Sequence, residues 1–113
     1  MASGEYFFVF TICLTGGANY INNKILKYEW DREKNAANKA KHGIGFEEAA
    51  TFEWDTAFVT RDLRADYGEP RFTALGFIEA RLCVMIFTKR GDVVRIISLR
   101  KANARERRFY EEA

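Results

Sequence analysis

The first clear pattern in the chain is a short run over residues 26–30 in which apolar and polar side chains alternate, followed by a mostly polar segment. Alternation with a period of two predicts a β-strand. Asp31 suits a helix N-cap, and Gly43 suits the position just after a helix. We therefore expect a helix over 32–42. Its small apolar residues, which we expect to pack on the rest of the domain, are Ala36, Ala37 and Ala40.

A second short helix is predicted directly after this glycine. Over residues 46–53 the apolar side chains fall on one side of a helical projection. These side chains are Phe46, Ala49, Ala50 and Phe52. Glu47 and Glu48 suit the first turn of such a helix, where the helix dipole favours negative charge. The first part of the domain is therefore predicted to contain two helices joined by a tight turn.

Beyond residue 55 the period falls to two and stays there for most of the chain. Strands are predicted at 56–60, 70–78, 82–89 and 93–99. A hairpin turn at Arg90-Gly91-Asp92 joins the last two. Asn103 then begins a final helix over 104–112. Two N-terminal helices, an antiparallel meander of about four strands and a C-terminal helix make an α+β domain.

Strict alternation also sorts the arginines of this sheet onto its two faces. In the last strand it places Arg95 on the face of Leu99, and Arg100 on the opposite face. Because neither face is uniformly polar, both are expected to be partly covered. An arginine there needs an anionic partner or a route to solvent at the strand end. We therefore expect Arg100 at a rim where Arg71 joins it, with Glu69 as a partner for Arg71.

Size and composition fit one globular domain. The chain has 113 residues, of which 48% are apolar and 15% aromatic. A net charge of +2 is too small to indicate nucleic-acid binding, so that argument depends on local clusters of charge. Cys13 and Cys83 lie in apolar runs without metal-ligand spacing, which predicts buried thiols and a cytoplasmic location. No metal site is predicted, and no apolar run is long enough to span a bilayer.

Residues 1–25 differ from the rest of the chain. They contain an apolar run, Phe7–Leu14, that partly resembles a secretory signal but lacks the basic segment that precedes such a run. Besides export, the alternatives are an extra hydrophobic strand and a start codon assigned too early. Under the second alternative the natural chain begins near Leu26. We expect the functional domain to span 26–113.

Cations are concentrated where the last predicted strand meets the final helix. Arg100, Lys101 and Arg105 lie at this junction. Guanidinium and ammonium groups at such a density need an anionic partner, and the candidates are RNA, DNA and an acidic protein. The helix arginines have an alternative role as part of an ordinary solvated helix, paired four residues on with Glu111 and Glu112.

Cleavage of RNA without a metal ion needs a base for the 2′-hydroxyl, cations for the charged phosphorane and an acid for the leaving 5′-oxygen. The candidate cations are Arg71, Arg100 and Lys101. The candidate bases are His42 and Glu69, and the candidate acids are His42 and Tyr110. His42 has an alternative role, because a cationic histidine in the last turn of a helix is favoured by the helix dipole.

Three segments together resemble the BrnT family of toxins. The first contains Lys41-His42-Gly43 and Phe46-Glu47-Glu48-Ala49, the second is Gly68-Glu69-Pro70-Arg71 followed by Gly76, and the third contains Ile96-Ile97-Ser98-Leu99-Arg100-Lys101-Ala102. The resemblance covers about residues 26–112. Each segment alone is a weak signal, whereas the three at these separations are specific.

The resemblance implies a RelE-like ribonuclease fold and a type II toxin that cleaves RNA without a metal cofactor and blocks translation. It also implies a BrnA-like ribbon-helix-helix antitoxin, whose dimer binds two toxins in a heterotetramer. In that complex only the antitoxin contacts DNA directly. By position, it implies the functional residues His42, Glu69, Arg71, Arg100 and Lys101. Together with the basic helix, the candidate RNA-binding residues are Arg61, Arg95, Arg105 and Arg108.

Two other functions explain some of the same features. A non-catalytic module would use the basic patch to dock an acidic or amphipathic partner, and would act as a corepressor with a DNA-binding protein. An inactive product of a decayed locus would explain the unusual first 25 residues.

Overall fold

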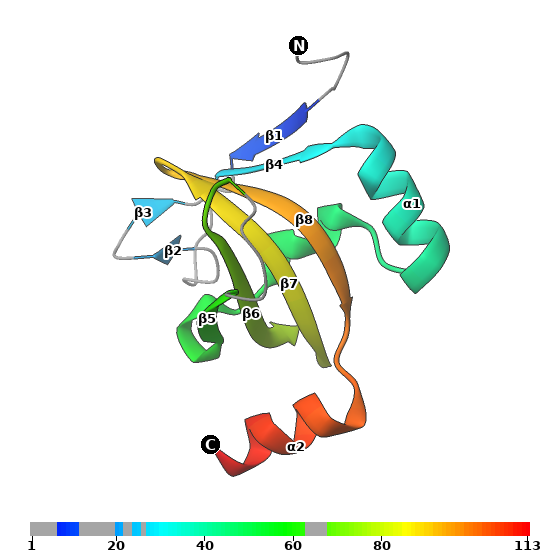
Figure 1. Ribbon diagram of the computed structural model, residues 1–113, viewed down its shortest axis with the longest axis vertical. Coiled ribbons are helices and arrows are strands. Elements are labelled where there is room, and N and C mark those ends of the chain that lie inside the picture. Colours follow the sequence, from blue (N-terminus) through cyan, green and yellow to red (C-terminus); the bar gives the residue numbers. More distant parts are fainter. Residues whose placement is uncertain (1–6, 12–19, 22–23, 26, 63–67) are drawn as a thin grey trace.

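The computed structural model describes residues 7–11, 20–21, 24–25, 27–62 and 68–113 (Figure 1). Within these residues a six-stranded sheet has the order β1-β4-β8-β7-β6-β5, and β2 and β3 pair separately. The strands are β1 (Phe7–Thr11), β2 (Tyr20–Ile21), β3 (Lys24–Ile25), β4 (Lys27–Asp31), β5 (Phe58–Asp62), β6 (Arg71–Ile78), β7 (Arg81–Arg90) and β8 (Val93–Lys101). The helices are α1 (Arg32–His42) and α2 (Ala104–Glu112), with two short 3-10 helices, η1 (Phe46–Thr51) and η2 (Trp54–Thr56).

The predicted α+β class is confirmed, and β5 to β8 form the predicted antiparallel meander. The predicted count of about four strands is wrong, because β4 and β1 extend the sheet beyond β8. β4 pairs with β8 in parallel, so the sheet is mixed. Alternation identified β4 as a strand, but it carries no information on which strand it pairs with or in which direction.

The first predicted helix is confirmed with the predicted ends. Asp31 Oδ1 accepts a hydrogen bond from the backbone N–H of Glu33 at 2.8 Å, and Gly43 ends α1 with a φ of 76°. The predicted packing is wrong, because all three alanines of α1 are exposed and its buried side chains are Asn35 and Asn38. The helix is oriented by buried amide hydrogen bonds, which an apolar pattern cannot reveal.

The second predicted helix is also wrong in type. Residues 46–53 form η1 and an extended segment, although the predicted apolar residues Phe46, Ala49 and Phe52 are buried. Phe46 and Ala49 are spaced by three, which places their side chains one above the other on a 3-10 helix. Phe52 then forms an isolated bridge with Ile78 of β6, so the chain must already be extended there. β5 begins at Phe58, two residues later than predicted, because the 3-10 helix η2 occupies residues 54–56.

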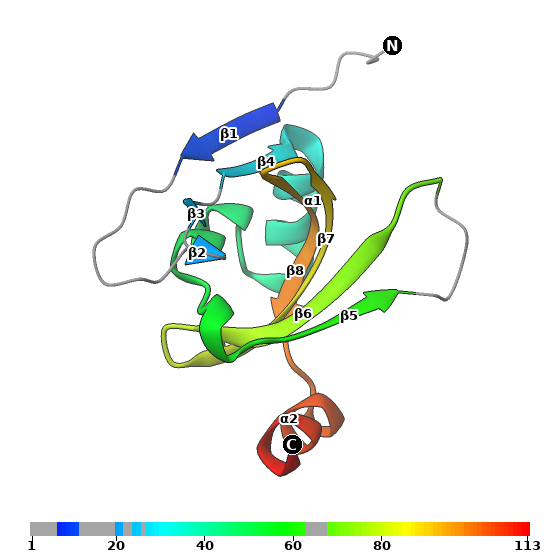
Figure 2. The same cartoon turned by 90° about the vertical axis from the view of Figure 1, so that its left-hand side faces the viewer.

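Two apolar clusters cover the two faces of the sheet. The larger cluster lies on the side of α1 and η1 and includes Trp30, Phe46 and Phe52, each at most 1% exposed. The smaller one consists of Leu75, Leu82 and Val84, packed by Tyr110 of α2. Figures 1 and 2 show α1 and η1 against one face, and α2 at the lower end of the molecule. The upper part of the second face therefore has no helix over it among the described elements.

The predicted burial of the cysteine thiols is confirmed for Cys83, which is fully buried and forms no disulfide. Burial raises the pKa of its thiol. Cys13 lies outside the described residues. Neither described helix is long or apolar enough to cross a membrane.

Candidate functional site

A β-bulge in β8 decides which side chains share the second face of the sheet. The β7–β8 register shifts after Ile86 and leaves Ile97 of β8 without an opposite residue. Beyond such a bulge, the residues that would point to one face of the sheet under strict alternation point to the other face. The strict alternation predicted for this strand is therefore wrong. Arg95 and Arg100 lie on the same face, and Leu99 lies on the other, in the core.

Among the described residues, the face opposite α1 and η1 carries four arginines, Arg71, Arg90, Arg95 and Arg100, and we call it the arginine face. Its central side chains are Arg71 and Thr73 from β6, Ile86 and Thr88 from β7, and Arg95, Ser98 and Arg100 from β8. All of them except Thr88 are half-buried. On the other side of β8, the side chains of Val94, Ile96 and Leu99 are at most 1% exposed. The arginine face is therefore the partly accessible side of the sheet.

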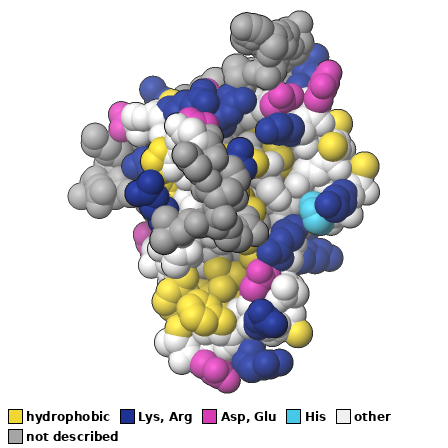
Figure 3. All heavy atoms as spheres, viewed as in Figure 1, with side chains coloured by type: hydrophobic (Ala, Val, Ile, Leu, Met, Phe, Trp, Pro, Cys, Tyr) yellow, Lys and Arg dark blue, Asp and Glu magenta, His cyan; other side chains and the backbone are white. Residues whose placement is uncertain are grey.

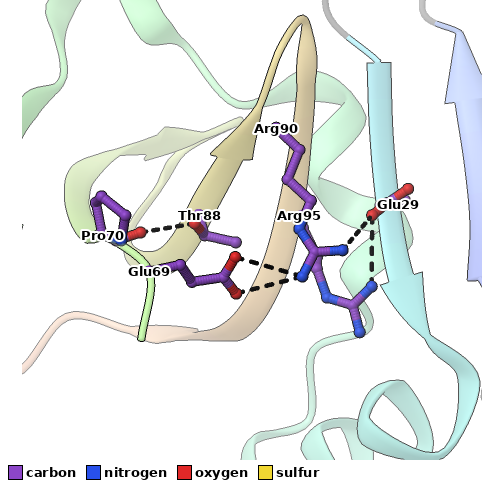
Figure 4. Close-up of polar contacts among 6 residues, drawn as sticks. All are labelled: Glu29, Glu69, Pro70, Thr88, Arg90 and Arg95. Atoms are coloured by element: carbon purple, nitrogen blue, oxygen red, sulfur yellow. Dashed lines mark hydrogen bonds and ion pairs between the residues drawn. The ribbon is translucent and has the colours of Figure 1, made fainter. Parts of the chain in front are cut away.

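Cross-strand neighbours form a polar row at the end of the arginine face nearest the β7–β8 turn. The register pairs Asp62 with Arg71, Thr88 with Arg95, and Arg95 with Glu29. Arg95 Nη1 lies 3.4 Å from Glu29 Oε2, and the two side chains are only 14% and 16% exposed (Figure 4). Arg95 thus has a carboxylate partner inside the protein, which makes it a structural residue of this row.

Glu69 lies at the same end, where it was expected as a base and as a partner of Arg71. Its Oε2 is 3.3 Å from Arg90 Nη2, in a contact that the sequence did not predict (Figure 4). Thr88 Oγ1 donates a hydrogen bond to the carbonyl oxygen of Pro70 at 2.6 Å. This bond anchors the segment that carries Glu69 to the neighbouring strand β7.

The Arg100 guanidinium forms a bidentate ion pair with Glu106 of α2. Nη1 donates to Oε1 at 2.9 Å, and Nη2 donates to Oε2 at 2.8 Å. The hydrogen bond from Arg100 is the main cause that lowers the pKa of Glu106, so the carboxylate is ionised at neutral pH. A bidentate pair of this kind fixes the plane of the guanidinium as well as its position.

The sequence analysis did not single out Glu106, although a signal for it exists. Asn103 and Glu106 have the spacing of a capping box, in which each side chain accepts from the other's backbone N–H. The structure has both bonds, at 2.8 Å to Asn103 Oδ1 and 2.9 Å to Glu106 Oε1. A capping box at this point places the carboxylate of Glu106 in the first turn of α2, close to the end of β8.

The expected meeting of Arg71 and Arg100 at one rim does not occur. Arg100 shares a row with Val84 of β7 and Leu75 of β6. Leu75 lies four residues along β6 from Arg71, which is about 13 Å at 3.3 Å per residue. The arginine face therefore has two ends, an Arg71 end with Glu69 and an Arg100 end with Glu106.

His42 and Lys101 lie off the arginine face, His42 at the end of α1 and Lys101 at the end of β8. Lys101 is paired with Cys83, so it belongs to the opposite face, and its side chain is exposed at the end of β8. His42 is half-buried at the end of α1 and makes no hydrogen bond or ion pair with any residue that the structure describes. Figure 3 shows the histidine side chain at the surface with Lys and Arg side chains next to it.

Tyr110, a candidate acid, has its hydroxyl in a structural hydrogen bond. Tyr110 Oη donates to the carbonyl oxygen of Thr56 at 3.0 Å. Its ring packs edge-on against Phe58 and Phe77, with ring centroids 5.6 and 5.4 Å away. The side chain therefore attaches α2 to β5 and β6.

The candidate RNA-binding arginines outside the arginine face are exposed. Arg61 on β5 and Arg105 and Arg108 on α2 make no hydrogen bond or ion pair within the described part of the chain. The ion pairs expected within α2 to Glu111 and Glu112 are also not formed in this fully described helix. Within the described structure these guanidinium groups are available to contact a polyanion.

Among the described residues, no three His, Cys, Asp or Glu side chains are grouped so that they could hold a metal ion. The chemistry that the described residues offer is a set of guanidinium groups on one face of the sheet, with carboxylates beside them, and a histidine at the end of α1. Such an arrangement can bind and stabilise an anion that carries developing negative charge.

The chain was compared with models of known protein families. The model described as "Ribonuclease toxin, BrnT, of type II toxin-antitoxin system" matches residues 30–106. The matched segment contains both ends of the arginine face, together with His42, Glu69 and Lys101. No curated protein matches the chain.

Proposed function

The chain belongs to the BrnT family of ribonuclease toxins of type II toxin–antitoxin systems, and from this premise we propose that it cleaves RNA on the arginine face without a metal cofactor. The observation that carries the proposal is the β-bulge in β8, because it brings Arg95 and Arg100 to the face that already holds Arg71. The cleavage blocks translation in the cytoplasm.

The chemistry is centred on the Arg100 end of the arginine face. The paired Glu106 holds the Arg100 guanidinium in one orientation, so it can stabilise a charged phosphorane without reorganising. His42 has no hydrogen-bond partner in the described structure, which leaves its ring available for proton transfer. Lys101, exposed at the strand end, adds a second positive charge near the scissile phosphate.

The Arg71 end serves to bind the RNA on either side of the cleaved bond. Arg71 and the row of Arg100 are about 13 Å apart along the sheet, so we assign the two ends to different phosphates of the RNA. Arg71 therefore contacts a neighbouring phosphate, with Glu69 shaping that subsite, and the exposed Arg61, Arg105 and Arg108 extend the path of the RNA. Their contacts are to the backbone and carry no sequence preference.

The partner of the toxin is a BrnA-like ribbon-helix-helix antitoxin. Its dimer binds two toxins, and DNA is contacted through the antitoxin alone. The family membership supports an antitoxin of some kind, and the arginine face offers an anionic segment of it a place to bind. Covering the Arg100 end would block cleavage directly.

The test is cleavage of RNA by the purified protein in the presence of EDTA. We expect cleavage by the wild type and a loss of about 100-fold or more in Arg100→Ala, because one preorganised charge donor is worth that much. Arg107→Ala is the matched control, since Arg107 is exposed on α2, and it should cleave normally. Intact RNA with the wild type, together with normal growth on expression, would refute the proposal.

One observation favours a second function, that of a non-catalytic corepressor. Arg95 and Arg100 are both already paired with carboxylates of this chain, Glu29 and Glu106. If those pairs persist when RNA is present, the arginine face binds a partner without catalysing a reaction. Repression of the operon by toxin and antitoxin together, with no cleavage of RNA, would identify this function.

A further inference from the structure

Among the described residues, no strand lies beside one edge of β8 at the point where Arg100 leaves the sheet. The parallel register with β4 covers β8 from Val93 to Arg95 and ends there. Leu99 lies four residues further on, and its side chain is fully buried. A buried backbone N–H and C=O at this edge would need partners from outside the sheet.

Asn38 of α1 supplies both partners. Its Oδ1 accepts from the Leu99 N–H at 3.2 Å, and its Nδ2 donates to the Leu99 carbonyl oxygen at 2.7 Å. The same Nδ2 donates to the carbonyl oxygen of Ile44 at 2.9 Å. The side-chain amide therefore takes the place of a neighbouring strand's peptide group, and both of its N–H donors are used.

These bonds act on the peptide that precedes Arg100. The Leu99 carbonyl is bonded directly to the Arg100 nitrogen, so whatever fixes that carbonyl also fixes the direction in which Arg100 leaves the strand. The β-bulge at Ile97 lies only three residues away, where the β7–β8 register is irregular. The β7 side alone therefore constrains this part of β8 less than a regular ladder would.

We propose that Asn38 is a positioning residue for Arg100, which it holds in the orientation needed for cleavage through the Leu99 peptide. This inference rests on the proposed function at the Arg100 end. Aspartate cannot replace Asn38, because a carboxylate would face the carbonyl oxygens of Leu99 and Ile44 with no hydrogen to donate.

Asn35 provides a matched control on the same helix. It is as buried as Asn38, at 7% against 8% exposed. It makes two hydrogen bonds, from its Nδ2 to Glu47 Oε2 and to its Oδ1 from the Phe46 N–H, both at the start of η1. Loss of Asn35 removes an anchor of α1 without touching β8, so it reports the effect of destabilisation alone.

The experiment measures kcat and KM of RNA cleavage for the wild type, Asn38→Ala, Asn35→Ala, Arg100→Ala and the double variant Asn38→Ala/Arg100→Ala. We expect Asn38→Ala to lower kcat about 10- to 100-fold with KM little changed, since small misplacement of a catalytic group has effects of that size. Asn35→Ala should keep its kcat. In the Arg100→Ala background the Asn38 substitution should have no further effect, because it acts only through Arg100.

Each outcome decides the inference. A folded Asn38→Ala with normal kcat overturns it, and so does an equal loss of kcat with and without Arg100. If Asn38→Ala does not fold, Asn38→Ser is measured in its place, with the same expectations.

If the wild type does not cleave RNA, the proposed function fails, and the side-chain NMR signal of Arg100 then tests the inference about Asn38 without a cleavage assay. That signal should shift in the Asn38 variant but not in Asn35→Ala, and an unchanged signal would overturn the inference.

Discussion

Glu106 combines two roles in one carboxylate, because it caps the first turn of α2 and pairs with Arg100 of β8. Its side chain is 27% exposed and that of Arg100 31%, so water screens the pair only in part. The pair joins the final helix to the sheet at the point where the strand ends. A single residue thus links the stability of α2 to the orientation of the candidate catalytic arginine.

Glu106→Gln should lower the free energy of unfolding at pH 7 by about 1 kcal/mol, because the neutral amide loses the charge and one of the two acceptor oxygens that Arg100 uses. The pKa of Glu106 is lower in the folded protein than its ordinary value of 4.5, so the stabilisation is present above that pH and is lost as the pH falls below it.

Urea unfolding of the wild type and of Glu106→Gln at pH 7 and at about pH 3 checks this prediction. The difference between the two proteins should shrink at the lower pH. A difference that stays constant would mean that the charge of Glu106 contributes nothing to stability.

At the scale of elements, Gly76 of β6 lies against two residues that directly follow the 3-10 helices, Phe52 after η1 and Ala57 after η2. A Cβ at this position would lie 2.8 Å from the Phe52 ring and 3.0 Å from the Ala57 Cβ. The absent side chain therefore allows the ring of Phe52 to lie directly on the strand. This close approach gives Gly76, one of the residues in the motif that identified the family, a packing role.

Gly76→Ala should destabilise the protein by about 1–3 kcal/mol, because the added methyl forces the buried Phe52 ring to move. Thermal or urea unfolding measures the loss. Phe52→Leu in combination with Gly76→Ala tests the cause, since the smaller side chain should remove part of the penalty. Equal penalties with Phe52 and with Leu at that position would show that another contact is responsible.

The attachment of α2 gives a prediction about catalysis. Because the Tyr110 hydroxyl donates to the Thr56 carbonyl, it cannot at the same time protonate a leaving group. Tyr110→Phe should therefore keep full RNA cleavage while it loses about 1 kcal/mol of stability from the missing hydrogen bond. Cleavage assays and urea unfolding on the same preparation separate the two effects. A large drop in kcat with unchanged stability would restore Tyr110 as the candidate acid.

At the scale of the whole molecule, the arginine face extends from the β7–β8 turn to α2, and its two ends are expected to do different work. Arg71→Gln should raise KM several-fold and leave kcat within about two-fold, as expected for loss of a uniform binding contact. Arg100→Ala should lower kcat instead. Steady-state kinetics on one RNA compares them, and a loss of kcat in Arg71→Gln would place the reaction at the other end.

Local patterns in the sequence determined a large part of the molecule. Residue spacing and the caps at Asp31 and Asn103 predicted the ends of α1 and α2, the meander from β5 to β8 and the burial of Cys83. Three separate motifs also identified the family. These features depend on side chains within a few residues of one another, so the amino-acid sequence is enough to predict them.

Tertiary structure alone decided the rest. The parallel pairing of β4, the bulge at Ile97 and the bonds between Asn38 and Leu99 all join groups distant in the chain or depend on the register of a neighbouring strand. Alternation counts residues along one strand, and one extra residue reverses every side chain beyond it. The sequence singled out these arginines as candidates, but only the sheet register could show that Arg95 and Arg100 share a face and that Arg71 lies at its other end.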